Sequence, residues 1–130
     1  MFRNEGMDAT HNPEFTMVEF YVAYKDYYWM METTEQLLEH AISTVNGDTK
    51  VQIGDHEIDF KGPFRRLTMF EAIEEYTGVD ISEMDEAALV KFAKELHIPV
   101  DDSMGKGKLI DEIFGEKVEG NLIQPTFITD

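Results

Sequence analysis

The chain has 130 residues, which is enough for one domain with a sizeable core and too few for two large ones. Hydrophobic residues make up 42% and charged residues 29%, a balance typical of a folded, soluble globular protein, and the absence of cysteine excludes disulfides and thiolate chemistry. The formal net charge of −16 at pH 7 argues against a main nucleic-acid-binding surface, because such surfaces neutralise phosphates with Lys and Arg.

The first residues lack the basic and apolar regions of a signal peptide. No later run approaches the roughly 20 apolar residues that are needed to span a bilayer. The sequence therefore predicts a cytoplasmic protein with no membrane partner, and the absence of cysteine is consistent with a reducing compartment.

Residues 1–24 read as a strand end, a turn-rich polar loop and a second strand. The loop gathers one arginine, Arg3, one histidine, His11, and an aromatic residue, Phe15. A guanidinium can bind a phosphate through two hydrogen bonds, an imidazole can contact a second phosphate, and an aromatic ring can stack on a base. From the residues alone, a nucleotide site is one possible interpretation of this loop.

The second strand is expected over residues 14–24. Both of its faces carry apolar side chains, which predicts a central strand covered on both sides. Glu19 is anomalous there, because a buried carboxylate is costly unless it meets a cation. Side chains two residues apart point the same way, so Phe15, Glu19 and Tyr21 are expected on one face, together with Arg3.

Helical spacing replaces this pattern from Asp26 to about Val45. Asp26 can cap the start of the helix, and Asn46-Gly47 ends it. The expected core-facing residues are Tyr27, Met30, Met31, Leu37, Leu38, Ala41, Ile42 and Val45. The expected polar face carries Glu32, Glu35, Gln36 and Glu39.

Two short runs, 50–53 and 57–60, flank Gly54-Asp55-His56 and predict a β-hairpin. Thr68 and Glu71 then have the spacing of a capping box, which predicts a helix through Tyr76 that Gly78 ends.

The character of the chain shifts after Gly78. Residues 85–97 and 106–118 predict two amphipathic helices in a small subdomain that packs mostly on itself, and residues 122–128 return to strand-like composition. The expected fold class is α+β, a partial antiparallel sheet with a small helical insertion. The expected division is a sheet-based part over 1–79, the helical insertion over 80–120, and a returning strand over 121–130.

Two weaker patterns do not indicate sites. The Gly105-Lys106-Gly107-Lys108 run lacks the preceding strand and the full Gly-Lys-Ser/Thr pattern of a phosphate loop. His40, His56 and His97 are too scattered to nominate a metal site.

The N-terminal run carries a family resemblance. F-R-N-E-G, followed by H-N-P-E-F-T-M-x-E-x-Y, resembles motif 2 of the class II aminoacyl-tRNA synthetases, in the form typical of the lysyl-tRNA synthetase branch. The likeness continues at residues 58–66 and 122–128, and it therefore covers nearly the whole chain in order. Residues 1–79 are then expected to be part of a catalytic core that contains the motif 2 hairpin.

The resemblance implies an ATP site. Arg3 matches the arginine that holds the α-phosphate and the substrate carboxylate, and so it is the expected catalytic residue. Glu5 is expected near the adenine amine, His11 at the outer phosphates, and Phe15 stacked on adenine. Asn12 is expected at the adenine edge through its backbone.

The resemblance also implies a lysine site, in which Glu19 and Tyr21 contact the amino groups of lysine and Arg3 contacts its carboxylate. The ammonium of the substrate would then be the cation that Glu19 needs. Arg65 and Arg66 are expected to be structural, or peripheral to the acceptor end of tRNA.

The implied activity belongs to a longer parent protein, a homodimer that uses ATP and Mg²⁺ to activate lysine and transfers it to tRNA in protein biosynthesis. Motif 1, the magnesium ligands and the motif 3 arginine are expected outside this sequence. The 130-residue chain by itself is therefore expected to be inactive, and to self-associate through exposed sheet edges.

Two alternatives stay open. One is a synthetase paralogue that transfers lysine to a protein. The other is a non-catalytic interaction module whose working surface is the acidic helical stretch, where Lys91 and Lys94 are the only Lys or Arg residues between Glu71 and Asp102.

Overall fold

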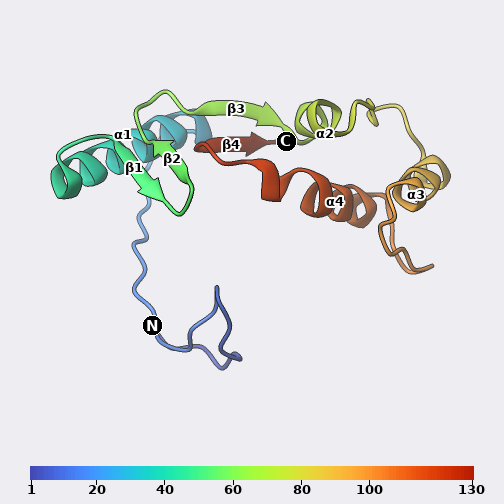
Figure 1. Ribbon diagram of the computed structural model, residues 1–130, viewed down its shortest axis with the longest axis horizontal. Helices are drawn as coiled ribbons and strands as arrows, with labels where there is room; N and C mark the ends of the chain where they lie inside the picture. The colour runs from blue at the N-terminus through green and yellow to red at the C-terminus, as the bar shows by residue number, and fades with distance from the viewer.

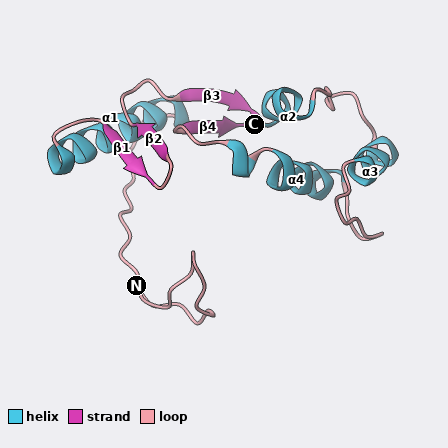
Figure 2. Ribbon diagram, viewed as in Figure 1, coloured by secondary structure: helices cyan, strands magenta, loops and turns pink.

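The computed structural model describes residues 1–130 and has mixed α+β architecture (Figures 1 and 2). The elements in chain order are α1 (Tyr27–Asn46), β1 (Lys50–Ile53), β2 (His56–Asp59), β3 (Arg65–Thr68), α2 (Met69–Thr77), α3 (Glu86–Glu95), α4 (Lys106–Lys117), the 3₁₀ helix η1 (Glu119–Asn121) and β4 (Thr126–Thr129). The predicted fold class is confirmed. The sheet is not wholly antiparallel, however, because β1 and β2 pair antiparallel while β3 and β4 pair parallel.

Three parts follow one another along the long axis of the molecule (Figure 1). Helix α1 and the β1–β2 hairpin lie at one end, the β3–β4 pair lies in the middle, and α2, α3 and α4 form the other end. The N-terminal segment hangs away from the rest and joins it through an extended stretch that leads into α1.

Both ends of α1 follow the predicted local signals. The Asp26 side chain accepts a hydrogen bond from the Trp29 backbone N–H at 2.9 Å, as an N-cap does. Gly47 adopts a left-handed conformation (φ 75°) and its N–H bonds to the Ser43 carbonyl, which satisfies one of the free carbonyls at the helix end. The predicted helix is therefore confirmed at both boundaries.

The predicted burial of α1 is wrong at several positions. Of the expected core face only Met31 is buried, whereas Tyr27, Leu37, Leu38 and Val45 are exposed. Glu35, expected on the polar face, is 6% exposed because it turns inward to an arginine of β3. A buried carboxylate requires such a partner. The amphipathic pattern of the helix alone does not predict this ion pair.

The predicted β1–β2 hairpin is confirmed, but β2 begins one residue earlier than expected, because His56 pairs with Ile53 and only Gly54, at φ 58°, and Asp55 lie between the strands. Asp59 holds the hairpin to its surroundings: its carboxylate accepts from the Thr49 hydroxyl at 2.9 Å and from the Lys61 N–H at 3.0 Å. The Lys61 backbone hydrogen bond is the main reason that the pKa of Asp59 lies below its usual value. The lowered pKa favours the ionised carboxylate, which accepts both of these hydrogen bonds.

A capping box begins α2 as the sequence predicts. The Thr68 hydroxyl accepts from the Glu71 N–H at 3.1 Å, and the Glu71 carboxylate accepts from the Thr68 N–H at 3.2 Å. Gly78, at φ 77°, ends the helix. These reciprocal bonds satisfy two backbone donors that would otherwise be free.

We expect Thr68→Ala to lower the free energy of unfolding by about 1 kcal/mol, the usual cost of losing a cap hydroxyl. Urea unfolding followed by far-UV circular dichroism measures this change. Thr68→Ser keeps the hydroxyl and serves as the control. Equal unfolding midpoints for Thr68→Ala and the unsubstituted chain would show that the cap does not contribute.

The main hydrophobic core lies at the helical end. Its ten buried residues come from α2, α3, α4 and the segments between them: Ala72, Ile73, Ile81, Leu89, Phe92, Ala93, Ile98, Leu109, Ile113 and Val118. Burial of each large apolar side chain contributes about 1.5–3 kcal/mol, so much of the stability of the chain resides here. Both predicted helices are confirmed, and α2 packs into the same core. The division at residues 79 and 80 stays a prediction.

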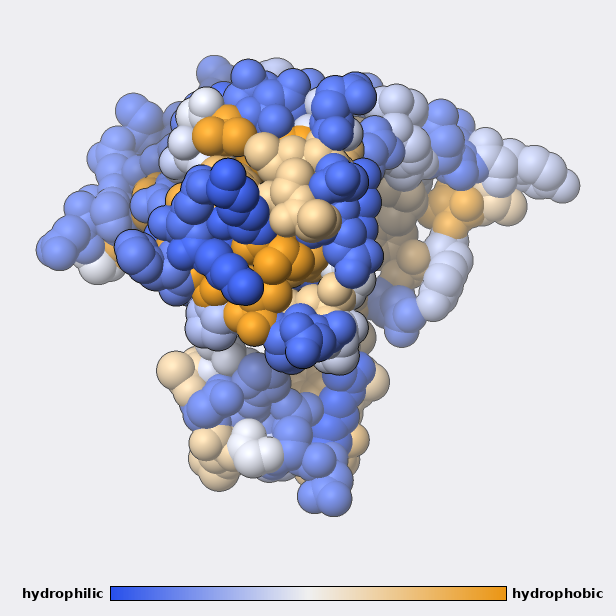
Figure 3. Space-filling model, turned by 90° about the vertical axis from the view of Figure 1, so that its right-hand side faces the viewer, coloured by the Kyte–Doolittle hydropathy of each residue, from blue (hydrophilic) through white to orange (hydrophobic).

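Seen from the α3 end, apolar surface shows between hydrophilic side chains (Figure 3). Partly buried apolar residues packed around the core include Val90, Val100 and Ile110. The stretch of the chain with the strongest acidic excess thus surrounds an apolar interior. None of the helices is both long enough and apolar enough to cross a membrane.

The strand predicted over residues 14–24 is absent. A single antiparallel bridge joins Phe2 to Glu14, and beyond Phe15 the chain runs without regular structure to the cap of α1. Val18, Tyr21 and Tyr24 are exposed, so the expected cover on both faces is also wrong. A strand needs neighbouring strands to accept its backbone hydrogen bonds, and no other strand of the chain lies beside this one.

Candidate functional site

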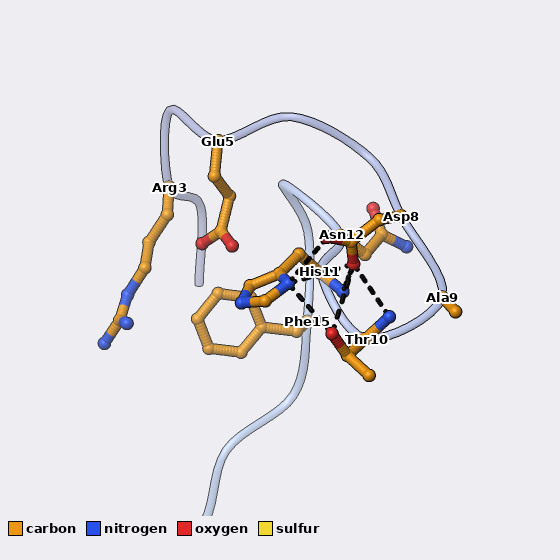
Figure 4. A pocket seen from close by; sticks show the side chains of 8 residues that line it. All are labelled: Arg3, Glu5, Asp8, Ala9, Thr10, His11, Asn12 and Phe15. Atoms are coloured by element: carbon orange, nitrogen blue, oxygen red, sulfur yellow. Dashed lines mark hydrogen bonds and ion pairs between the residues drawn. The ribbon is translucent and has the colours of Figure 1, made fainter. Parts of the chain in front are cut away.

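The N-terminal loop folds around a cavity of about 520 Å³ (Figure 4). Five of the predicted site residues line it: Arg3, Glu5, His11, Asn12 and Phe15. Asp8, Ala9 and Thr10 complete the lining. The structure thus brings together, around one space, the residues that the sequence proposed for a nucleotide.

Backbone hydrogen bonds close the two arms of the loop. The Arg3 N–H donates to the Pro13 carbonyl at 2.9 Å, and the Phe15 N–H donates to the Met1 carbonyl at 3.1 Å. These bonds place Arg3 beside Phe15, with the guanidinium carbon 5.3 Å from the centre of the ring. The expected hairpin is therefore reduced to a short bridge, but it still pairs a cation with an aromatic face.

His11 is held by a hydrogen-bond network that was not among the predicted features of the loop. Its Nδ1 lies 2.9 Å from Asp8 Oδ1 and 2.9 Å from the Thr10 hydroxyl. The same Asp8 oxygen accepts the backbone N–H groups of Thr10 at 2.8 Å and of His11 at 2.7 Å. Aspartate commonly bonds the backbone two residues on in turns, so the spacing of Asp8, Thr10 and His11 was the available signal.

The pKa of Asp8 lies below its usual value. The largest cause is the hydrogen bond from the Thr10 backbone, followed by the bond to the His11 side chain. Each of these donors favours the charged carboxylate. Asp8 therefore remains an ionised acceptor on the exposed side of the loop.

Glu5 and Asn12 take different positions in the loop. Glu5 is half-buried, and its side chain lies on the same arm of the loop as Arg3 (Figure 4). The Asn12 side chain accepts the Glu14 N–H at 3.3 Å and so serves the turn itself. The side-chain oxygen of Asn12 is therefore engaged within the loop.

Glu19 and Tyr21 lie outside the lining of this cavity. The Tyr21 hydroxyl donates to Glu19 Oε1 at 2.5 Å, and this bond is the main reason that the pKa of Tyr21 is raised. The two side chains therefore share a side of the extended segment, as their alternation predicts. Tyr21 is 87% exposed, so this pair has no cover from the rest of the chain.

Arg65 and Arg66 each make an ion pair away from the cavity. Arg65 Nη2 lies 2.7 Å from Glu75 Oε2 at the surface, and Arg66 pairs with the buried Glu35. The Arg66 guanidinium also lies over the Phe127 ring, 5.4 Å from its centre. For Arg66 these contacts indicate a structural role.

No group of three or more His, Asp or Glu side chains in the structure has the arrangement of a metal site. The acids of the N-terminal loop do not converge, because Asp8 faces His11 and Glu5 lies on the opposite arm. These residues give no basis for placing a magnesium ion.

The fold and the loop agree with one family of proteins. The family model described as tRNA synthetases class II (D, K and N) matches residues 1–130. The chain belongs to this family.

Within this family, the chain is similar to several individual proteins that share one name. The chain is 67% identical over 129 residues to a protein of Christiangramia forsetii named lysine–tRNA ligase, covering 99% of this chain and 23% of that protein. It is 64% identical to the lysine–tRNA ligase of Porphyromonas gingivalis, covering 22% of that protein. It is 57% identical to that of Azobacteroides pseudotrichonymphae, covering 26%. The chain thus spans about a quarter of the length of the curated relatives that it matches.

Proposed function

We propose that this chain supplies the ATP-binding loop and part of the lysine-binding surface of a lysine–tRNA ligase. The observation that carries the proposal is the convergence of Arg3, Glu5, His11, Asn12 and Phe15 around one cavity. The identity of 57–67% to proteins named lysine–tRNA ligase supports the choice of amino acid.

The chemistry of the lining suits ATP. The cavity falls within the range of about 300–1,000 Å³ that is usual for small-molecule sites. Phe15 offers a face for adenine, and Glu5 offers an acceptor for its exocyclic amine. Arg3 offers a forked cation for the α-phosphate, and His11 lies on the other arm of the loop, where it can meet the outer phosphates (Figure 4).

Glu19 and Tyr21 are the proposed contacts for lysine. A carboxylate and a phenol hydroxyl already joined by a hydrogen bond present oxygen acceptors to an ammonium group. The ammonium group of the proposed lysine would donate a hydrogen bond to Glu19, either in place of the Tyr21 hydroxyl or together with it. The cation missing beside Glu19 in this chain would then come from the substrate.

The proposed reaction has two steps. The lysine carboxylate attacks the α-phosphorus of ATP, and lysyl-adenylate forms as pyrophosphate leaves. The terminal ribose hydroxyl of tRNA then attacks the lysyl carbonyl and releases AMP. Arg3 would hold the carboxylate and the α-phosphate together and offset the charge that develops between them, so its contribution is positioning and electrostatic stabilisation.

The metal, the tRNA and the oligomeric state of the parent protein are part of the same proposal. Class II lysyl-tRNA synthetases generally use ATP and Mg²⁺, and the proposed magnesium ligands lie outside these residues. We propose a homodimeric parent protein that binds lysine, ATP and tRNA in the cytoplasm. The open edges of the two-stranded sheets are the proposed route by which the chain by itself self-associates.

A chimeric ligase tests this function. We expect the chain by itself to give no measurable lysine-dependent ATP–pyrophosphate exchange. We expect robust exchange when the chain replaces the matching segment of the Christiangramia forsetii ligase, because the cavity lining is then joined to the rest of that protein. A folded chimera without exchange would contradict the proposed function, and so would exchange that does not depend on lysine.

Transfer to tRNA separates the ligase from the two alternatives. A chimera that forms lysyl-adenylate but charges a protein instead of tRNA would favour the paralogue interpretation. A chimera that binds neither ATP nor lysine would favour the interaction module.

A further inference from the structure

Asp8 is so placed that it controls one ring nitrogen of His11. Its two carboxylate oxygens lie 2.9 and 3.0 Å from His11 Nδ1 (Figure 4). Its Oδ1 also accepts the two backbone N–H groups of Thr10 and His11, which turns the carboxylate back toward the ring. The contact is therefore built into the turn and does not depend on a freely moving side chain.

This contact determines which nitrogen carries the proton. An ionised carboxylate only accepts hydrogen bonds, so a bare Nδ1 would place its lone pair against two oxygens. The Thr10 hydroxyl, 2.9 Å from Nδ1, would not relieve the contact with two carboxylate oxygens, so the geometry points to Nδ1 as the protonated atom and leaves Nε2 for other partners. The depressed pKa of Asp8 supports an ionised carboxylate at this position.

We propose that Asp8 is a positioning residue that fixes the Nδ1–H form of His11 and presents Nε2 to the anionic end of the nucleotide. This inference rests on the proposed ATP site. Donation from Nε2 to a phosphate oxygen requires the doubly protonated ring, whose second proton comes from the solvent, and Asp8 then balances the positive charge from the other side of the ring. The other charged groups that line the cavity are Arg3 and Glu5.

The resting state of the ring is measurable without any ligand. Ring ¹⁵N shifts of the 130-residue chain are expected to show Nδ1 protonated and Nε2 bare when His11 is neutral. The chain has four histidines, and the signal lost in His11→Gln identifies the relevant one. Asp8→Asn keeps an oxygen for the backbone donors but removes the charge, so it is expected to shift the proton toward Nε2. An Nε2–H ring in the unsubstituted chain would overturn the inference.

The chimeric ligase tests the functional part. Asp8→Asn is expected to raise KM for ATP about tenfold with little change in kcat or in KM for lysine, as loss of one charge-assisted hydrogen bond does. In a His11→Gln background the same substitution is expected to change KM for ATP by less than about twofold. An equal effect in both backgrounds would mean that Asp8 only shapes the loop, and would overturn its role through His11.

Arg3→Ala separates the two levels of the proposal. Exchange that falls with Arg3→Ala but is unaffected by Asp8→Asn would contradict the positioning role and leave the ATP site standing. Exchange unaffected by either substitution would contradict the ATP site itself.

Discussion

Arg3→Ala in the chimeric ligase is expected to lower kcat/KM for lysine-dependent exchange by at least about a hundredfold. One well-placed donor to a developing charge commonly contributes a factor of about 10²–10³. Arg3 is expected at or above the lower end of this range, because its proposed position serves both the lysine carboxylate and the α-phosphate. Steady-state exchange of labelled pyrophosphate measures the change.

Arg65→Ala is the matched control. Arg65 is also an exposed arginine, but its ion pair with Glu75 lies outside the cavity lining, so we expect exchange within about twofold of the unsubstituted chimera. Glu19→Gln provides a contrast: KM for lysine is expected to rise while KM for ATP stays unchanged. A rate within threefold of normal for Arg3→Ala would show that Arg3 does not hold the reacting groups.

Glu35→Ala is expected to cause the largest loss of stability among the charged residues, about 3 kcal/mol. Glu35 pairs with Arg66, and its Oε2 accepts the backbone N–H of the buried Phe64 at 3.2 Å. The substitution strands both donors in a place that water reaches poorly, and breaking a largely buried pair typically costs about 3–5 kcal/mol. The lower end applies because the Arg66 side chain is one-third exposed.

Trp29 provides a specific probe for this loss. It is the only tryptophan and lies in α1, so its fluorescence during urea unfolding reports the element that carries Glu35. Glu32→Ala, on the exposed face of the same helix, is the control and is expected to change stability by less than about 0.5 kcal/mol. Coincident unfolding curves for Glu35→Ala and Glu32→Ala would contradict a stabilising role for the pair.

The local features of this fold were predictable because their causes are local. Asp26, Thr68 and Gly78 mark helix boundaries through bonds to residues three or four positions away, and such spacings are visible in the sequence. The burial of Glu35 was not predictable, because its partner Arg66 lies 31 positions later. Gly62 also belongs to this contact, since a Cβ there would lie 3.1 Å from Glu35 Oε2.

In the candidate site, too, the features with local causes were predictable and the others were not. The alternation of Glu19 and Tyr21 predicted their shared side, and the motif residues Arg3 and Phe15 were found together. The covered strand over 14–24 was wrong, because cover depends on neighbours that the composition of a segment does not specify. Asp8 was missed because its contribution to the site comes from the turn that it makes with His11, and its residue type alone does not indicate that turn.

The parallel pairing of β3 with β4 has a consequence for how the chain is made. Arg65 pairs with Thr126, so β3 leaves the ribosome with its partner still unsynthesised. The cost of closing a flexible loop grows with its length, but α2, α3 and α4 lie within this loop and share one core. We expect the helices to assemble first and to bring the ends of the loop together. The core of the helical end would then serve as the template on which β4 docks beside β3.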